Sequence, residues 1–535
     1  MMGKGGGMPA YSPKRKIFSK SNRKEAAREA ARELAAKPSQ DVARLKNRLA
    51  TKYKTPYLKN SEILAFVPRS LASLRRSLLK SPTRTLSGVS PLALMPPPAP
   101  CPGRCIYCPK GENAPQSYTG YEPATMRAIQ CGYSASRQVK ARLEQYAAQG
   151  HATDKCHLIV MGGTFLCAPE ARRLAFMKET FEALNGRKSR TLRAAIDANE
   201  RAPHRAIGVT FETRPDFGMQ KEADWMLSAG GTQVELGVQA LSDAVYRKVL
   251  RGHTVADVAR SSAVLRDCGF KLCYHMMPGL FSTPKQDVEY FRRLFSDERL
   301  RPDMVKIYPV LVMQGTPLYD MWKRGEFEPY STEKAAEVIA DATRFIPPYV
   351  RVPRIQRDIP SPLVAAGVKN SNLRQIVDEL LRGRGEKCRC IRCREVGSEE
   401  RKGKLAGKLK LELYQREYAA SGGKEIFLSF EDEGKDLIAG FLRLRIPHQP
   451  HREELAASSV VRELHVYGQE AGIGEHASDK EQHKGLGGKL LLEAERISRE
   501  EVGMEKISVL SGPGARGYYR KLGYSLEGAY MQKEI

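Results

Sequence analysis

The sequence lacks long apolar runs. A helix needs about 18 or more apolar residues to span a bilayer, and none of the 535 residues form such a stretch. The opening residues, MMGKGGGMPAYSPKRK, are basic but contain no apolar core of a secretory signal. We therefore expect a cytoplasmic protein with no transmembrane helix and no membrane partner.

Acidic residues are also scarce. The chain has 88 Lys and Arg against 61 Asp and Glu, a net charge of +27. Residues 1–80 hold 20 Lys and Arg but only 5 Asp and Glu, so more than half of the excess lies there. Such a segment favours nucleic acid, because binding to phosphates releases counterions. The alternative is a solvated charged helix, since residues 22–36 have opposite charges three positions apart.

Three cysteines are spaced C-x-x-x-C-x-x-C in the run CPGRCIYC. They are Cys101, Cys105 and Cys108. An odd number of thiols in eight residues does not form a disulfide framework, and a chain without an export signal keeps its 11 cysteines reduced. Three thiolates can hold a four-iron cluster and leave one iron open for a substrate or cofactor. The alternatives are a zinc knuckle or unrelated thiols.

The chain is too long for one core, and we expect several domains. Residues 1–84 are predicted to be a basic N-terminal region, disordered over 1–20 and then helical. From residue 85 to 345 short apolar strands alternate with helices, which predicts an α/β domain shaped as a partial TIM-like barrel. In such barrels the chemistry lies at the carboxyl ends of the strands, and the three-cysteine loop directly follows the first strand.

The expected elements have these bounds. Helices in the N-terminal region are expected at 25–36, 41–50 and 61–79. Strands of the barrel are expected at 89–95, 157–161, 206–212, 233–238, 271–275 and 304–310, with helices at 137–149, 170–184, 221–228, 254–268 and 284–295. Beyond residue 400 we expect strands at 426–430, 437–446, 460–467 and 507–510 and a helix at 486–501.

A second group of cysteines lies in a basic linker predicted over residues 346–400. Cys388, Cys390 and Cys393 form the run CRCIRC. Three thiolates and one remote Cys or His complete a tetrahedral zinc site, so zinc is the expected ion. Unligated thiols and a second iron–sulfur cluster are the alternatives.

A glycine-rich turn, QHKGLGG at 482–488, opens the last long helix of a predicted C-terminal domain over 401–535. Free N–H groups at a helix N-terminus suit a pyrophosphate, and the turn is not a Walker A loop because the Lys-Ser/Thr end is missing. With the strand at 460–467 and the run GYYRKLGY, it resembles the acetyl-CoA site of GNAT acetyltransferases. In that fold a splayed strand supplies backbone groups to pantetheine, and a late tyrosine acts as a general acid. For Tyr518 and Tyr519 the alternative is aromatic packing.

A third glycine-rich feature follows the predicted strand at 157–161. Gly162 and Gly163 stand in the run MGGT, where the absence of side chains lets the backbone approach a ligand. An ordinary strand-to-helix turn explains the same residues.

A set of local strings resembles the catalytic subunit of Elongator, a family of tRNA wobble-uridine modifying enzymes. The strings are GENAPQSYTGYEPATMRA (111–128), LIVMGGTF (158–165), FETRPDF (211–217), ELGVQA (235–240), RGHTV (251–255), YHMMPGL (274–280), KIYPVLV (306–312), RIQRDIP (354–360), CREVG (393–397), VRELHVYG (461–468) and YYRKLGY (518–524). The resemblance runs from about residue 85 to the C-terminus.

The resemblance implies a radical-SAM barrel followed by a GNAT domain. Cys101, Cys105 and Cys108 would hold a 4Fe-4S cluster that binds S-adenosylmethionine, beside Gly162 and Gly163. Acetyl-CoA contacts map onto Lys155, Glu463, Leu464, His465, Val466, Leu486, Gly487, Gly488 and Tyr519, with Tyr519, Tyr518 and Lys155 as catalytic candidates. Many relatives have a longer insertion between the first two cysteines, and this chain has the compact form.

The implied reaction forms 5-carboxymethyluridine at the wobble position of tRNA. A 5′-deoxyadenosyl radical would activate the acetyl methyl group for addition to C5 of uridine, and Arg351, Arg354 and Arg357 would hold phosphates. We expect a stand-alone archaeal or bacterial form that acts without other Elongator subunits; whether it is a homodimer stays open. A protein lysine acetyltransferase with a structural cluster, and an RNA-binding scaffold without enzyme activity, are the rival interpretations.

Overall fold

The computed structural model describes residues 20–68, 70–79, 88–397, 409–467 and 485–535. Two compact units divide the chain. The first comprises residues up to Arg84 together with Glu144–His151, and the second comprises Thr85–Leu143 and Ala152–Ile535. No helix of the described residues has the length and apolarity needed to cross a membrane.

The N-terminal unit is helical, as predicted. It contains α1 (Lys20–Ala36), α2 (Val42–Lys52), α3 (Asn60–Leu64) and α4 (Ala72–Ser77). The alanines of α1 recur on one face and pack with Leu45 and Leu49 of α2 in a buried cluster. The single helix expected at 61–79 is wrong. Pro68 separates α3 from α4, because proline lacks the amide hydrogen and its ring obstructs a continuous helix.

All five acidic residues of this region form ion pairs inside it. Glu29 pairs with Lys52, Glu33 with Arg48 and Glu62 with Arg23, so these three pairs join different helices. The remaining pairs are Arg28–Glu25 and Arg44–Asp41. The carboxylates are thus used within the unit, and most of its Lys and Arg residues have no acidic partner available in residues 1–80.

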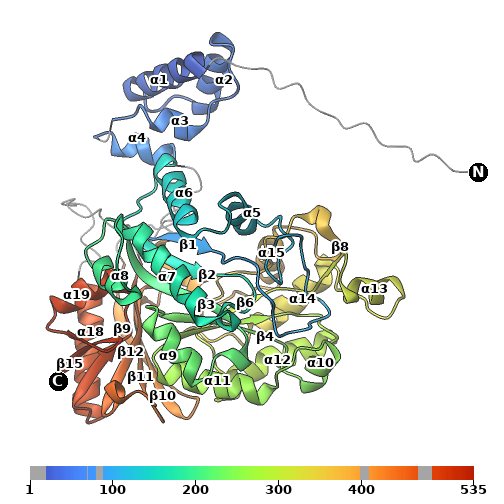
Figure 1. The fold of residues 1–535 in the computed structure, drawn as a ribbon, viewed down its shortest axis with the longest axis vertical. Coiled ribbons are helices and arrows are strands. Elements are labelled where there is room, and N and C mark those ends of the chain that lie inside the picture. Colours follow the sequence, from blue (N-terminus) through green and yellow to red (C-terminus); the bar gives the residue numbers. More distant parts are fainter. Residues whose placement is uncertain (1–19, 69, 80–87, 398–408, 468–484) are drawn as a thin grey trace, which may run out of the picture. The chain divides into compact units, whose positions relative to one another are not determined.

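Six parallel strands form the sheet predicted after residue 85 (Figure 1). They pair in chain order, which gives an open partial barrel. The strands are β1 (Ser90–Leu94), β2 (Lys155–Val160), β3 (Arg205–Thr213), β4 (Gln233–Gln239), β5 (Lys271–Met276) and β6 (Met304–Ile307). Along β2, Cys156, Leu158 and Val160 are fully buried and alternate with half-buried residues, so successive side chains face opposite sides.

Helices connect these strands. Their bounds are α5 (Pro123–Gln130), α6 (Ala135–Ala148), α7 (Glu170–Asn185), α8 (Leu192–Asn199), α9 (Gln220–Ser228), α10 (Asp243–Lys248), α11 (Val255–Asp267) and α12 (Pro284–Ser296). Figure 1 shows α7, α9, α11 and α12 along one side of the sheet. Helix starts follow the sequence signals, since Thr254 and Thr283 each form a capping box with the residue three positions later.

Regular elements follow β6 both before and within the linker predicted over 346–400. Before it lie β7 (Leu311–Met313), α13 (Pro317–Lys323) and α14 (Thr332–Thr343), and within it lie β8 (Val364–Gly367), α15 (Leu373–Gly383) and α16 (Ile391–Arg394). Strand β7 pairs with β8. The buried face of α15, formed by Leu373, Val377 and Leu381, anchors the segment. None of these elements was predicted from the sequence.

A seven-stranded sheet forms the C-terminal part. Its order is β14-β15-β13-β12-β11-β10-β9, and its only parallel pair is β12 with β13. The strands are β9 (Glu412–Ala420), β10 (Gly423–Asp432), β11 (Leu437–Ile446), β12 (Ser458–Val466), β13 (Lys506–Val509), β14 (Ser525–Glu527) and β15 (Tyr530–Glu534). Helix α18 (Leu486–Arg496) covers one face with Leu490, Leu491 and Ala494. Here β9, β14 and β15 were not predicted.

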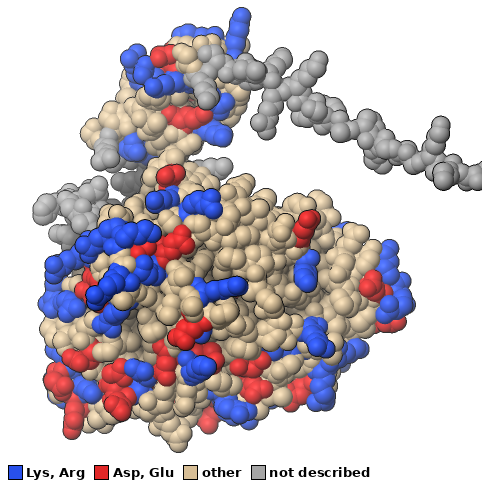
Figure 2. Space-filling view, in the orientation of Figure 1, with Lys and Arg blue, Asp and Glu red and all other residues tan. Residues whose placement is uncertain are grey.

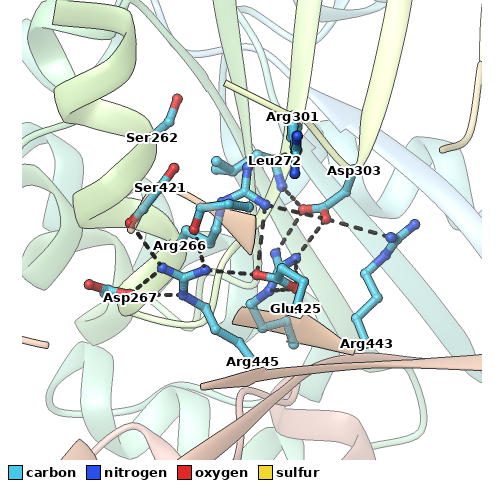
Figure 3. A network of polar contacts seen from close by, with 12 residues as sticks. Ser262, Arg266, Asp267, Leu272, Arg301, Asp303, Ser421, Glu425, Arg443 and Arg445 are labelled. Carbon is cyan, nitrogen blue, oxygen red and sulfur yellow. Dashed lines mark hydrogen bonds and ion pairs between the residues drawn. The ribbon is translucent and has the colours of Figure 1, made fainter. Parts of the chain in front are cut away.

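The other face of this sheet meets the amino ends of the parallel strands through buried arginines (Figure 3). Arg462 of β12 donates two hydrogen bonds to Asp303, at 2.6 and 2.8 Å, and others to Glu425. Arg445 pairs with Glu425 at 3.0 Å and with Asp267 at 2.5 Å. Because Asp303 precedes β6 and Asp267 ends α11, this network fixes one sheet against the other.

Candidate active site

The three-cysteine loop lies at the carboxyl edge of the parallel sheet, as predicted. It follows β1, and backbone hydrogen bonds from Ile106 to Val249 (3.2 Å) and from Leu318 to Ile106 (3.0 Å) hold it there. A third bond, from Cys108 N to Cys105 O (3.1 Å), closes a turn between the last two cysteines. These three bonds fix the loop at the edge of the sheet.

Each of the three thiols has its own polar neighbour. Cys101 Sγ lies 3.6 Å from Thr164 Oγ1, Cys108 Sγ lies 3.0 Å from Ser117 Oγ, and Arg251 donates to Cys105 Sγ at 3.4 Å. Burial raises the pKa of Cys108, although its hydrogen bond with Ser117 opposes the rise.

Three thiols on one loop can hold an iron–sulfur cluster. Cys101, Cys105 and Cys108 all lie on the loop at the carboxyl edge of the sheet, and the backbone hydrogen bonds of Ile106 and Cys108 hold that loop in place. A four-iron cluster bound by three thiolates leaves one iron open.

Gly162 and Gly163 line a pocket beside Cys101, together with Pro96, Thr164 and other residues. Their φ angles are +114° and +73°, in the region that favours glycine. A Cβ on Gly162 would lie 3.2 Å from Pro96 Cδ, and one on Gly163 would lie 3.3 Å from the carbonyl oxygen of Gln116. The turn therefore needs glycine at both positions, and it brings backbone to the thiol edge.

Polar side chains inside the parallel sheet were missed by sequence analysis. Glu235 of β4 accepts a hydrogen bond from Lys306 and lies 2.7 Å from His275 Nε2. Burial alone would raise the pKa of Glu235, but the Lys306 charge and the His275 hydrogen bond hold it well below its usual range. Nearby, Tyr118 donates to Glu212 at 3.1 Å. The signal was available as the charged or polar residues Glu235, His275 and Lys306 within the otherwise largely apolar strings ELGVQA, YHMMPGL and KIYPVLV.

This polar interior continues to the amino edge of the sheet. Gln233 donates to Glu235 at 3.3 Å. At the start of β5, burial lowers the pKa of Lys271 while Glu463 of β12 opposes the shift. A polar interior thus extends between the thiol loop at one edge and the seven-stranded sheet at the other.

Strand β12 separates from β13 partway along its length. Their parallel pairing ends at Val461 and Val509, whereas β12 continues to Val466 and, among the described strands, pairs there only with β11. Beyond Val461, β13 therefore no longer occupies the backbone of β12. This splay is the feature that the GNAT resemblance predicts for the pantetheine of acetyl-CoA.

The N-terminus of α18 lies beside the splayed strand. Gly485 caps the helix with φ +87°, and residues 482–484 of the predicted turn lie outside the described residues. A Cβ on Gly487 would lie 3.1 Å from the Tyr518 hydroxyl, 3.7 Å from Val466 and 3.9 Å from Leu464. A Cβ on Gly488 would meet nothing within 4 Å. These predicted residues are brought together, and Leu486 at the helix start is buried.

The two tyrosines occupy different environments. Tyr519 is 7% exposed, packs in the apolar cluster under α18, and has its pKa raised by burial. Tyr518 is 43% exposed and turns its hydroxyl toward Gly487. Of the two, Tyr518 is the one placed to meet a ligand at the helix N-terminus.

Side chains of β12 divide between two faces. Leu464 and Val466 face Gly487, whereas Glu463 pairs with Arg443 at 2.9 Å. His465 packs against Tyr467 with the rings tilted and their centres 4.4 Å apart, and burial lowers the pKa of His465 to about 4. Glu463 and His465 therefore have only their backbone available to a ligand in the splay.

Lys155 opens β2 at the amino edge, away from the thiol loop. It lies in register with Arg205 of β3, and a Cβ on Gly514 would lie 2.5 Å from Arg205 Cβ. Gly514 belongs to the turn between β13 and the helix that carries Tyr518. The position of Lys155 thus associates it with the C-terminal domain.

Cys388, Cys390 and Cys393 come together as a compact group. Their sulfur atoms all lie within 4.8 Å of one another, and Cys390 Sγ is 3.6 Å from Cys393 Sγ. Hydrogen bonds from Cys388 and then from Cys393 lower the pKa of Cys390, although burial opposes the shift. Three convergent thiols, one of them readily ionised, can hold a metal ion.

The three arginines expected to hold phosphates make hydrogen bonds within the protein. Arg351 donates to Glu395 and to the Tyr467 hydroxyl, each at 2.7 Å. Arg354 pairs with Asp358, and Arg357 donates to the Ser117 carbonyl at 2.8 Å. The Arg351 contacts tie the linker to the C-terminal sheet.

Family models match most of the chain. Residues 95–295 match the radical SAM superfamily, residues 302–382 match the Radical_SAM C-terminal domain, and residues 398–524 match the acetyltransferase (GNAT) family. The predicted fold class is therefore confirmed: a radical-SAM partial barrel is followed by a GNAT domain, with helices at the N-terminus.

Known proteins are similar over nearly the whole length. A tRNA uridine(34) acetyltransferase of Dehalococcoides mccartyi is 48% identical over 462 residues, covering 85% of this chain and 100% of the relative. Elongator complex protein 3 of Homo sapiens is 42% identical over 513 residues, covering 92% of this chain and 93% of the relative. The structure of archaeal Methanocaldococcus infernus Elp3, lacking N-terminal residues 1–46, is 43% identical with a TM-score of 0.75 and covers 84% of this chain and 100% of that one. The chain therefore belongs to the family that comprises the tRNA uridine(34) acetyltransferases and Elongator complex protein 3.

Proposed function

We propose that this protein uses acetyl-CoA and S-adenosylmethionine to form 5-carboxymethyluridine at the wobble position of tRNA. Its relatives named tRNA uridine(34) acetyltransferase support tRNA as the substrate and the use of an acetyl group. The polar interior of the parallel sheet is the observation that carries the proposal, because it extends between a thiol loop at one edge and an acetyltransferase strand at the other.

At the thiol edge, Cys101, Cys105 and Cys108 hold a 4Fe-4S cluster. Such a cluster with bound S-adenosylmethionine supplies one-electron chemistry for activating an unreactive C–H bond. Gly162 and Gly163 keep the backbone next to Cys101 clear of side chains. Their role is to let the cofactor approach the open side of the loop.

At the acetyl-CoA edge, the chain offers the splayed backbone of β12 and the N-terminus of α18. Backbone groups of Glu463 to Val466 bind the pantetheine arm, and the free amides after Gly485 receive the pyrophosphate. Tyr518 presents its hydroxyl to this site, so we assign the general acid to Tyr518 rather than to Tyr519. Lys155 lies on the same edge and binds the acyl carrier.

Inside the sheet, Lys306 and His275 act on the acetyl group or the uracil ring. Both are 15% exposed and are held by Glu235. Lys306 stays protonated, because the Glu235 carboxylate holds its pKa above the usual range despite the opposing effect of burial. A fixed cation beside a reacting carbonyl stabilises the negative charge that develops on its oxygen.

The basic surface supports tRNA as the partner. The N-terminal unit uses its five carboxylates internally, which leaves an excess of cations for phosphates. Figure 2 shows a second gathering of Lys and Arg over and around α8, where Arg187 and Arg190 are exposed. These contacts position the tRNA and do not read its sequence.

The remaining assignments concern organisation. Cys388, Cys390 and Cys393 bind a zinc ion that rigidifies the linker next to Arg351. The domains are a tRNA-binding region at 1–84, a radical-SAM domain at 85–345, a linker at 346–400 and a GNAT domain at 401–535. The protein acts without other Elongator subunits.

An anaerobic assay tests the proposed function. Protein with a reconstituted cluster is incubated with tRNA, acetyl-CoA and S-adenosylmethionine, and nucleosides are measured by mass spectrometry. We expect 5-carboxymethyluridine only when all three substrates are present, and none from a Cys105→Ser, Cys108→Ser variant. Acetylated lysine on protein without S-adenosylmethionine dependence would instead favour the lysine acetyltransferase.

A further inference from the structure

Arg251 is a buried arginine without a carboxylate partner in the part of the chain that the structure describes. Its side chain is 8% exposed. Its guanidinium donates to the Gly237 carbonyl at 2.6 Å, to His253 Nε2 at 3.0 Å and to Cys105 Sγ at 3.4 Å. None of these partners is a carboxylate.

Several other buried arginines are neutralised by carboxylates. Arg462 and Arg445 each pair with two carboxylates, and Arg394 pairs with Glu431 and Asp436. A buried charge without a counterion is costly, which is why such pairs are normal in protein interiors. Arg251 departs from this pattern at the thiol loop.

The three groups that Arg251 contacts include no carboxylate. Burial and then the Arg251 charge lower the pKa of His253 to about 4, so its ring accepts the hydrogen bond uncharged. The Gly237 carbonyl is neutral. Among these described partners, the Cys105 sulfur and the group that it binds are the ones that can carry a negative charge.

The neighbouring arginines make a useful contrast. Arg214 also reaches the loop, since its Nη1 would lie 2.1 Å from a Cβ on Gly103. Asp216 neutralises Arg214 through hydrogen bonds of 2.9 and 2.7 Å. Arg357, next to Ser117, is only half-buried and is screened by water. Arg251 is the deeply buried cation whose charge stays available to the loop.

We propose that Arg251 is the counter-charge of the cluster site and raises its reduction potential. The inference rests on the proposed binding of a cluster by Cys101, Cys105 and Cys108. Reduction adds one electron to a site that three thiolates already make anionic, and net charge and hydrogen bonds to sulfur set such potentials. No proton moves and no bond forms or breaks at Arg251, which is a positioning residue rather than a catalytic one.

Potentiometric titration tests the proposal without any substrate. Wild-type protein, Arg251→Gln and Arg251→Lys are reconstituted, and the reduced fraction is followed by electron paramagnetic resonance at set potentials. Arg247→Gln is the matched control, because it removes the same charge from an exposed position of α10. We expect the reduced-to-oxidised ratio at a fixed potential to fall about 10-fold or more in Arg251→Gln, which equals about 59 mV for one electron.

The charge-retaining Arg251→Lys and the control Arg247→Gln should stay near the wild-type ratio. A wild-type ratio in fully loaded Arg251→Gln would overturn the proposal. An equal fall in Arg251→Lys would overturn it as well, because the charge would then be irrelevant.

A second pair keeps the test open if Arg251→Gln does not fold. His253→Glu gives the guanidinium a carboxylate at the atom that it already contacts, and His253→Gln is the neutral control. The ratio should fall in His253→Glu but not in His253→Gln. Equal reduced-to-oxidised ratios in His253→Glu and His253→Gln would refute the role of Arg251 and leave the proposed function intact. A wild-type protein that binds no cluster would refute the proposed function as well.

Discussion

Removing the carboxylate of Asp303 should uncouple the two catalytic sheets. Asp303 is fully buried and accepts hydrogen bonds from Arg462, at 2.6 and 2.8 Å, and from the Leu272 amide at 2.8 Å. Arg443 approaches it to 3.6 Å. Asp303→Asn removes the negative charge that neutralises Arg462 and Arg443 in this buried interface. Breaking a buried ion pair by removing one partner costs about 3–5 kcal/mol.

The assay is chemical denaturation of the full chain. Both tryptophans lie in the radical-SAM domain, so their fluorescence reports its unfolding. Hydrogen exchange of the β5 amides adds a local measure, because about 1.4 kcal/mol corresponds to a tenfold change in an opening equilibrium. We expect exchange to be faster by about two to three and a half orders of magnitude in Asp303→Asn. Glu289→Gln, which removes an acid from an exposed pair with Arg292, should leave exchange unchanged.

The pH dependence gives a second readout. Burial alone would raise the pKa of Asp303, but Arg462 and then Arg443 hold it well below its usual range. A carboxylate with a depressed folded-state pKa contributes its stability above the unfolded value of about 4, and loses it as the pH falls toward the folded value. Asp303→Asn should therefore flatten the acid side of the stability profile below about pH 4. Wild-type stability and an unchanged acid profile in Asp303→Asn would refute this reasoning.

Three further predictions concern the other sites. Gly487→Val should raise the dissociation constant of acetyl-CoA at least about 10-fold, because its side chain would fill the space beside the Tyr518 hydroxyl. Gly517→Ala, whose Cβ meets nothing within 4 Å, should leave that constant unchanged. Isothermal titration calorimetry measures both constants. Tyr518→Phe should slow CoA release on the order of 10²-fold, the scale of a lost general acid, whereas Tyr519→Phe should not; the reverse order would exclude our assignment. Cys388→Ser should remove one zinc ion per chain and leave the iron content unchanged, as measured by elemental mass spectrometry. A zinc content equal to that of the wild type would contradict the zinc site.

The strands of the parallel sheet could be predicted because their signal is local. Along β2 the alternation of buried Cys156, Leu158 and Val160 with half-buried neighbours is written in six consecutive residues. The thiol loop was located in the same way, since three cysteines in eight residues have few uses. Its position at the carboxyl edge followed from the rule that places loops after parallel strands.

Long-range electrostatics could not be predicted in that way. Arg462 and Asp303 are 159 residues apart in the sequence, and each looks like an ordinary surface residue until the two sheets meet. Strand β9 was missed for a related reason. Its residues alternate between exposed and half-buried, so the segment lacks the apolar pattern that marks a strand.

The assignment of side chains to the GNAT site was only partly available from the sequence. The motif indicated which stretch of β12 lies near acetyl-CoA, but not which side chains turn toward it. Glu463 is drawn to Arg443 instead, and Tyr519 is drawn into the apolar cluster under α18. Both outcomes depend on packing partners that are distant in the chain.

A β-bulge in β12 limits how freely the GNAT domain can be exchanged between enzymes. Its register with β11 shifts by one residue, so that Arg443 faces Glu463 while Leu444 faces Val461. This bulge lets Arg462 and Glu463 both turn toward the radical-SAM domain. The GNAT domain therefore cannot be exchanged between enzymes by itself. A chimeric enzyme must retain both Arg462, the extra residue of the bulge, and Asp303, because either residue alone would leave an unpaired charge in the buried interface.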